Sequence, residues 1–284
     1  YRWVHGESDG LPGLVVDRFG DVLSVQITTA GMERMTEEVV AALKKVSSAA
    51  VIVLKNDTSA RQLEGLESKV DVVVGELPEL VPLVENGAKF EVPLLDGQKT
   101  GWYYDHRMNR LRLQNYVAGQ RVLDLFSYVG GWGIEAATAG AREVLCVDGS
   151  ERFLERVHHN AALNGVTEKV ATLQGDVFDA LKELRGAREQ FDVVIVDPPA
   201  FIKRKKDHKE GLLAYRRVNE LAMRLLSRDG ILVSASCSHH LQRVELKRLL
   251  LASSRHIDRN LMLLEEGHQG PDHPVYPAIP ETEY

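Results

Sequence analysis

The segment SASCSHH, residues 234–240, places one of only two cysteines in the chain between serines, where an apolar strand is expected to end. A cysteine thiolate is both a strong nucleophile and a good leaving group, so it suits covalent catalysis at an accessible position. A free cysteine can also act as a small buried hydrophobic residue. The position of Cys237 after a strand, among hydroxyl side chains, is compatible with both interpretations, and the residues alone leave them open.

Acidic residues accompany the four expected strands that precede Cys237. Asp124 lies in the first strand-turn segment, and aspartates end the next three strands, at positions 148, 176 and 197. The carboxyl ends of parallel strands form one edge of a sheet, where ligands bind. A single acid there would be ordinary loop composition. Four acids in register with successive strands indicate one polar site.

The segment DLFSYVGGWG, residues 124–133, contains three glycines that allow a ligand to approach the backbone closely. It lacks both the G-x-G-x-x-G pattern of dinucleotide sites and the phosphate-binding P-loop. A carboxylate before the glycines would repel a pyrophosphate and attract a sulfonium or ammonium group. Asp148 can accept hydrogen bonds from both ribose hydroxyls, and Asp176 can accept one from an adenine amine. The set predicts S-adenosylmethionine rather than NAD as the cofactor.

The elements that must position these residues alternate between helix and strand. Apolar runs predict strands at residues 121–127, 143–150, 169–176, 191–199 and 231–238. Helical patterns lie at residues 106–117, 133–141, 151–165, 178–186 and 211–226. This alternation predicts right-handed crossovers and a Rossmann-like α/β fold with a doubly wound, mainly parallel sheet.

The N-terminal part of the chain has a different pattern. A Phe-Gly-Asp turn in residues 11–27 predicts a two-stranded hairpin, and apolar residues at helical spacing predict a helix over 32–46. Further strands are expected at 50–56 and 70–76, and a second hairpin at 85–101. We therefore expect a small α+β domain over residues 1–95 and a catalytic domain over residues 96–284.

The composition, 44% apolar and 27% charged, is that of an ordinary globular protein. The sequence holds no run of about 18 apolar residues, and its two cysteines fit a reducing cytoplasm. The net charge of −6 is carried by residues 1–95, with 9 basic against 15 acidic residues, so the rest has 26 of each. Residues 200–218 hold seven basic and two acidic side chains, so a polyanion is expected to bind there.

The motifs LDLFSYVGGWG, CVDGS, GDVFD, DPPAF and SCS occur in this order along the chain. They resemble the class I S-adenosylmethionine-dependent methyltransferases, and more narrowly the bacterial 23S ribosomal RNA large-subunit methyltransferase I family, which makes 5-methylcytosine. GESDGLPGLVVDRFGD near the start, QKTGWYYDHR at 98–107 and HPVYPAIPETEY at the end are also similar to that family. Family members carry an N-terminal RNA-binding PUA domain, which we expect this sequence to lack.

The resemblance and the strand-end pattern together give a set of expected site residues. The expected catalytic residues are Cys237 and Asp197. The expected cofactor-binding residues are Lys99, Thr100, Gly101, Asp124, Phe126, Ser127, Tyr128, Gly130, Asp148, Ser150, Asp176 and Asp197. The expected RNA-binding residues are Phe201, which can stack on a flipped-out base or pack in the core, and the charge run of Lys203, Arg204, Lys205 and Lys206, which can contact phosphates or be a solvated face.

The resemblance implies a covalent mechanism, because carbon 5 of cytosine is a poor nucleophile until a thiolate adds to carbon 6. Many RNA cytosine-C5 methyltransferases use a second cysteine in the Asp-Pro-Pro region, but DPPAF contains none. Cys146 lies mid-strand, where a packing role is expected. Asp197 is a candidate for accepting the C5 proton or for binding the cytosine edge, and the sequence leaves both roles open.

Other functions remain open from the sequence. A methyltransferase acting on a guanine or adenine nitrogen would need no covalent step, and a non-catalytic RNA- or nucleotide-binding protein would need no methyl donor. An NAD dehydrogenase is disfavoured by the missing glycine pattern. The histidines after Cys237 have no partner cluster at metal-ligand spacing, so no metal is expected. Ribosomal RNA is the expected partner, and the resemblance implies a homodimer.

Overall fold

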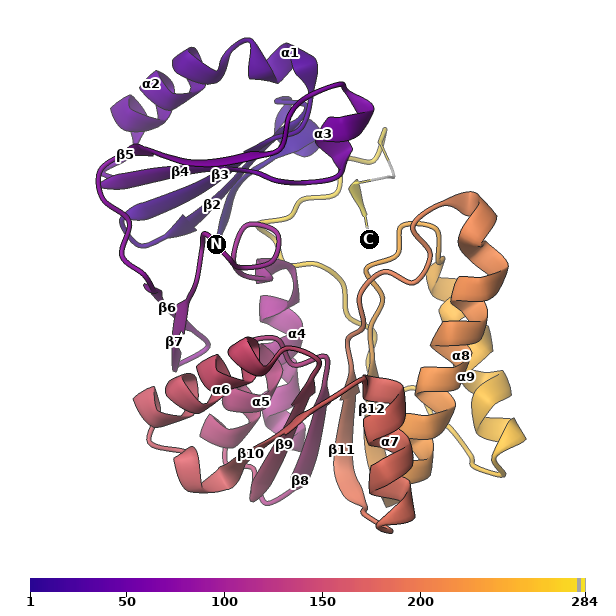
Figure 1. The fold of residues 1–284 in the computed structure, drawn as a ribbon. Helices are drawn as coiled ribbons and strands as arrows, with labels where there is room; N and C mark the ends of the chain where they lie inside the picture. Colours follow the sequence, from indigo (N-terminus) through magenta and orange to yellow (C-terminus); the bar gives the residue numbers. More distant parts are fainter. Residues whose placement is uncertain (280–281, 284) are drawn as a thin grey trace. The chain divides into compact units, whose positions relative to one another are not determined.

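The computed structural model describes residues 1–279 and 282–283, and the chain forms two compact units (Figure 1). The first unit comprises residues 1–85, 89–108 and 268–283, and the second comprises residues 86–88 and 109–267. The predicted domain boundary at residue 95 stays a prediction. Of the C-terminal motif HPVYPAIPETEY, residues 280, 281 and 284 lie outside the described part of the chain.

The first unit is built on a five-stranded sheet in the order β1-β2-β3-β4-β5. Its strands are β1 (Arg2–His5), β2 (Leu14–Phe19), β3 (Val22–Ile27), β4 (Val51–Asn56) and β5 (Lys69–Val74). The helices α1 (Ala30–Glu33), α2 (Thr36–Val46) and α3 (Ala60–Leu63) accompany the sheet, and β6 (Val81–Glu85) pairs with β7 (Ala88–Val92). The predicted hairpin in residues 11–27 is confirmed, because β2 and β3 are antiparallel neighbours.

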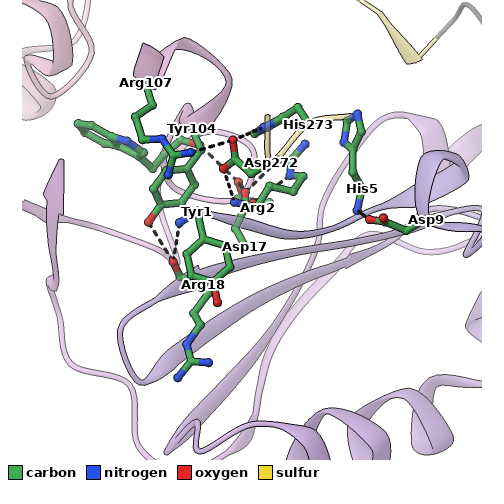
Figure 2. A network of polar contacts seen from close by, with 12 residues as sticks. Tyr1, Arg2, His5, Asp9, Asp17, Arg18, Tyr104, Arg107, Asp272 and His273 are labelled. Atoms are coloured by element: carbon green, nitrogen blue, oxygen red, sulfur yellow. Dashed lines mark hydrogen bonds and ion pairs between the residues drawn. The ribbon is translucent and has the colours of Figure 1, made fainter. Parts of the chain in front are cut away.

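Charged groups bind the C-terminal segment of the first unit, which starts at residue 268, to the rest of that unit (Figure 2). The carboxylate of Asp272 accepts a hydrogen bond from the backbone N–H of Arg2 at 3.0 Å and from the guanidinium of Arg107 at 3.2 Å. Arg2 in turn binds Asp17 of β2 through two nitrogens, each 2.9 Å from a carboxylate oxygen. Four segments distant in sequence therefore share one ion-pair network.

The second unit contains a five-stranded parallel sheet in the order β10-β9-β8-β11-β12. Its strands are β8 (Arg121–Leu125), β9 (Glu143–Asp148), β10 (Val170–Gln174), β11 (Phe191–Val196) and β12 (Leu226–Ser234). The chain winds outward from β8 to β10 and then returns to the other side of β8. The predicted doubly wound α/β fold is confirmed, with its topological switch point between β8 and β11.

Helices cover both faces of this sheet. The helices of this unit are α5 (Gly131–Thr138), α6 (Glu151–Leu163), α7 (Val177–Gly186), α8 (His208–Leu225) and α9 (Arg243–His256). Helix α4 (Arg107–Leu113) begins with the residues at 107–108 of the first unit and continues into the second. Leu123 and Leu125 of β8 belong to the core formed with α7 and α8. Successive strand residues point to opposite faces, so Asp124 faces α5 instead. Within the described residues, no helix is long and apolar enough to cross a membrane.

The last strand ends earlier than the sequence predicts. β12 stops at Ser234, so Cys237 lies in the following loop and not at the strand end itself. Ala235 still donates to the carbonyl of Val196, but the backbone N–H of Ser238 then bonds the hydroxyl of Ser236 at 3.1 Å. This side-chain bond replaces a ladder bond and turns the chain away from the sheet.

Candidate functional site

The loop after β8 has an unusual backbone. Phe126 and Tyr128 have positive φ angles of 61° and 50°, and Gly130 follows at 90°. A non-glycine residue in this region is strained by about 1–3 kcal/mol, and such residues cluster at ligand sites. The end of β9 holds the loop in place, because the carbonyl of Val147 accepts the Ser127 N–H at 3.0 Å and Asp148 accepts the Tyr128 N–H at 2.9 Å.

Asp124 is fully buried beneath this loop. One of its carboxyl oxygens accepts the backbone N–H of Gly133 at 2.9 Å, and the other has no partner among the described residues. Burial raises the pKa of Asp124 to about 8; the Gly133 N–H opposes the shift, while the charges of Asp197 and Asp148 add to it. A buried acceptor without a donor, surrounded by other carboxylates, favours a cationic ligand.

Gly133 lets helix α5 approach the sheet closely. A Cβ at this position would lie 2.5 Å from the sulfur of Cys146 and 3.0 Å from Asp124, so only glycine fits without a shift. Cys146 is fully buried in β9, as its mid-strand position predicts. Burial, with smaller contributions from Asp124 and Asp148, raises the pKa of its thiol well above the usual value. Cys146 is therefore a packing residue that stays protonated.

Two further carboxylates are oriented by backbone N–H groups at the same edge of the sheet. Asp148 accepts from Tyr128 and from Ser150, each at 2.9 Å, and burial nevertheless raises its pKa. Ser150 caps α6 by accepting from the Phe153 N–H. Asp176 caps α7 through Oδ1, while its exposed Oδ2 has no hydrogen-bond partner within the described residues.

These groups fit the chemistry of S-adenosylmethionine. The unpaired oxygen of Asp124 suits its cationic part, and the fixed carboxylates of Asp148 and Asp176 suit hydroxyl and amine donors. The hydroxyl of Ser127 is buried and also has no partner among the described residues. The strained loop supplies Phe126, Ser127, Tyr128 and Gly130 together, next to the end of β9. Their individual contacts with the cofactor stay predictions.

Asp197 and Cys237, the two expected catalytic residues, lie at neighbouring loops. Asp197 follows β11 and accepts a hydrogen bond from the indole N–H of Trp132 at 2.9 Å. Cys237 is half-buried, and its sulfur lies 3.7 Å from the carbonyl oxygen of Pro198. The thiol is therefore beside the Asp-Pro-Pro loop and is not enclosed in the core. Trp132 was not predicted, because its bond to residue 197 joins segments 65 residues apart.

One buried phenol holds both neighbours of Cys237. The hydroxyl of Tyr215, in α8, lies 2.7 Å from the hydroxyl of Ser238 and accepts a hydrogen bond from Ser236 at 3.0 Å. The Ser238 hydroxyl also accepts the backbone N–H of Ile202 at 3.2 Å, which links this loop to the segment after Asp-Pro-Pro. Tyr215 is fully buried, and burial raises its pKa. We call Tyr215, Ser236 and Ser238 the hydroxyl clamp.

Phe201 and the charge run follow the Asp-Pro-Pro motif. The ring of Phe201 is half-buried and packs on Tyr215, with ring centroids 4.8 Å apart, and more loosely on Phe126 and Phe178 at 6.3 Å each. The four basic residues are exposed; Arg204 pairs with Asp207 at 2.8 Å. Phe201 thus has a packing role, and base stacking by Phe201 stays a prediction, as does phosphate binding by Lys203, Arg204, Lys205 and Lys206.

The segment of Lys99, Thr100 and Gly101 belongs to the first unit. Lys99 has a positive φ of 49°, and its ammonium lies 4.7 Å from the ring centroid of Tyr103. Thr100 is buried and donates its hydroxyl hydrogen bond to Asp17. Gly101 has a φ of 113° and is close to Leu94. The structure explains these residues locally, and their binding of the cofactor stays a prediction.

Comparison with known proteins gives consistent relatives. The family model of S-adenosylmethionine-dependent methyltransferases matches residues 14–274. The protein named ribosomal RNA large subunit methyltransferase I from Klebsiella pneumoniae (strain 342) is 37% identical over 286 residues, which cover 100% of this chain and 72% of that protein. The protein of the same name from Citrobacter koseri is also 37% identical with the same coverage. A protein whose crystal structure contains bound SAH is 25% identical, with a TM-score of 0.87, and the match covers 100% of this chain and 73% of that one.

Proposed function

Because the chain belongs to the ribosomal RNA large subunit methyltransferase I family of S-adenosylmethionine-dependent methyltransferases, we propose that it methylates carbon 5 of a cytosine in 23S ribosomal RNA. The observation that carries the cytosine assignment is the half-buried thiol of Cys237 beside the Asp-Pro-Pro loop. A nucleophile at that place is needed for cytosine C5 and for neither of the purine-nitrogen reactions. The proposal places the activity in the cytoplasm.

The cofactor supplies an electrophilic methyl group when it is bound. The residues that would hold it are the unpaired oxygen of Asp124 for the cationic part, Asp148 for the ribose and Asp176 for the adenine amine. The strained loop of Phe126 and Tyr128 shapes the backbone around it. Fixing that loop in the free protein means that little ordering remains to be done on binding.

The chain's own chemistry begins at Cys237. Its thiolate adds to carbon 6 of the cytosine, which makes carbon 5 nucleophilic, and after methylation loss of the C5 proton expels the thiolate. The hydroxyl clamp fixes the backbone on both sides of the sulfur. Asp197 is held by Trp132 and can either receive the C5 proton or accept from the cytosine N4 amine.

The test is a trapping experiment on the purified chain with 23S ribosomal RNA. With RNA containing 5-fluorocytosine, which has no C5 proton to lose, the wild type should form a covalent complex that survives denaturing electrophoresis. Cys237→Ala should form none and lose methyl transfer, while calorimetry shows unchanged binding of S-adenosylmethionine. Cys146→Ala is the control, because that buried thiol should leave the trapped complex intact. Methyl transfer that survives in Cys237→Ala, or a methylated purine nitrogen in mass mapping, would overturn the proposal.

A further inference from the structure

A second site lies at the start of helices α8 and α9, and we propose that it binds a backbone phosphate of the RNA strand beside the target cytosine. This inference rests on the proposed function, because it takes RNA as the substrate. The site is a cavity of about 590 Å³ lined by Lys205, His208, His239, His240 and Gln242. None of the twelve expected cofactor-binding residues lines it.

Every lining side chain ends in a group that can donate a hydrogen bond, while the larger part of the lining surface is carbon. Lys205 and His239 are exposed, and no ion pair of Lys205 is found within the described residues. The rings of His239 and His240 lie with centroids 5.2 Å apart, and both side chains line the cavity. A cavity with this lining suits an anion with several acceptor oxygens, which describes a phosphodiester.

The charge around the cavity supports an anion. Within the described part of the chain, the acidic contact found for a lining residue is that of Glu245 of α9, whose carboxylate lies 3.0 Å from Nε2 of His208 and occupies that nitrogen. Residues 200–218 carry seven basic and two acidic side chains, and Asp207 of those two is paired with Arg204. Lys205 lines the cavity, and its charge is not neutralised by an ion pair within the described residues. Further lysines lie at positions 203, 206 and 209 of the same segment.

The helix ends add to this field. His208 is the first residue of α8 and Gln242 is the N-cap of α9, and neither helix start has a side-chain cap. At α8 the His208 N–H already bonds the carbonyl of Lys205 in the preceding 3₁₀ turn, so it is the start of α9, which has no side-chain cap, that supplies the partial positive charge of a helix N-terminus. Figure 1 shows both helices leaving loops that follow β11 and β12, so both begin at the carboxyl edge of the sheet.

The residues that line the cavity come from the segments after β11 and β12, which also carry Asp197 and Cys237. His239 and His240 lie two and three residues after Cys237 in the loop after β12, and Lys205 lies four residues after Phe201, between β11 and α8. An RNA strand that presents a base to Cys237 carries a phosphate on each side of that nucleotide. Phosphate contacts position a nucleic acid without reading its sequence, so this site would set the register of the strand.

The test compares charge-matched variants of the full chain. Lys205→Ala and the double variant His239→Gln with His240→Gln alter the cavity; Arg228→Ala and His256→Gln are exposed controls at the start of β12 and the end of α9. Binding of a 23S ribosomal RNA fragment is measured by filter retention across a range of salt. In Lys205→Ala we expect affinity to fall about three- to tenfold and the slope of log K against log salt to fall by about 0.7–0.9, the value for one phosphate contact. The controls and the affinity for S-adenosylmethionine should not change.

Unchanged RNA affinity and salt slope in both cavity variants, with cytosine methylated, would overturn this inference and leave the proposed function intact. A purine methyl product with a reduced slope would leave the phosphate site standing and refute the cytosine assignment. Calorimetric titration with inorganic phosphate separates the two sources of the anion. Phosphate binding that is lost in Lys205→Ala without any change in RNA binding would assign the cavity to a free anion and overturn the inference.

Discussion

Asp124 shows how burial of one carboxyl prepares a site for a cation. Its pKa of about 8 means that the carboxyl is mostly protonated in the free protein at pH 7. A bound cation favours the carboxylate, so binding of S-adenosylmethionine should release a proton at that pH. Affinity should therefore rise between pH 6 and pH 8, by up to about tenfold per pH unit. Calorimetry at pH 7 in two buffers with different ionisation enthalpies measures the released proton directly.

Asp124→Asn is the matched control for this prediction, because the amide is similar in size and does not titrate. The variant should bind the cofactor weakly, with no proton release and no rise in affinity with pH. It should also unfold at a higher temperature than the free wild type at pH 8, since a folded-state pKa above the unfolded value lowers stability as pH rises toward it. Cofactor binding by the wild type without proton exchange at pH 7 would contradict the prediction.

At the scale of elements, the hydroxyl clamp connects helix α8 to the loop that carries Cys237 through the hydrogen bonds of Tyr215. Tyr215→Phe removes one hydroxyl and leaves Ser236 and Ser238 without their phenolic partner, which costs about 1–3 kcal/mol for buried groups. We expect the loop to loosen, so that alkylation of Cys237 becomes faster while methyl transfer becomes slower. Reaction with iodoacetamide followed by peptide mass analysis measures the first, and turnover at saturating RNA measures the second.

Tyr116→Phe provides the control for the clamp, because its exposed hydroxyl bonds Glu265 and not the Cys237 loop. Cofactor affinity should stay at the wild-type value in both tyrosine variants, which separates positioning of the thiol from general unfolding. Equal alkylation rates in Tyr215→Phe and the wild type, together with normal turnover, would show that the clamp does not position Cys237.

The strands and helices of the second unit show which features a sequence pattern can predict. The alternation of apolar runs and helical segments predicted each strand of the parallel sheet and placed Asp124 and Asp148 at its edge, because period and order are local properties. The bond between Tyr215 and Ser236 depends on the packing of α8 against β11 and β12, which no local pattern encodes. The early end of β12 was missed for a related reason, since the Ser236 side chain competes with the ladder there.

At the scale of the whole molecule, residues from the N-terminal and C-terminal parts of the chain bind each other in the first unit. Arg2 and Asp272 are 270 positions apart, so neither residue type nor spacing indicates that they meet. Their network lies beside a ring pair, His5 and His273, whose centroids are 5.1 Å apart (Figure 2). The sequence predicts β2 to β5 of this unit but not β1, and only the structure shows which charged groups bind its C-terminal segment.

This network should make the first unit sensitive to acid. Burial, followed by the charges of Arg2 and His273, lowers the pKa of His5 to about 4. For Asp272, burial alone would raise the pKa, but the hydrogen bonds from His273 and from the Arg2 backbone outweigh burial and lower the pKa to about 2. Both groups bind fewer protons when folded than when unfolded, so the free energy of unfolding should fall as pH drops, first from 6.5 toward 4 and again from 3.8 toward 2. Urea unfolding of the wild type, His5→Gln and Asp272→Asn at pH 8, 5 and 3 checks this. His5→Gln should lose the first step, and Asp272→Asn should be less stable than the wild type at pH 8 and lose the second. Identical pH profiles in all three proteins would show that the network does not set acid stability.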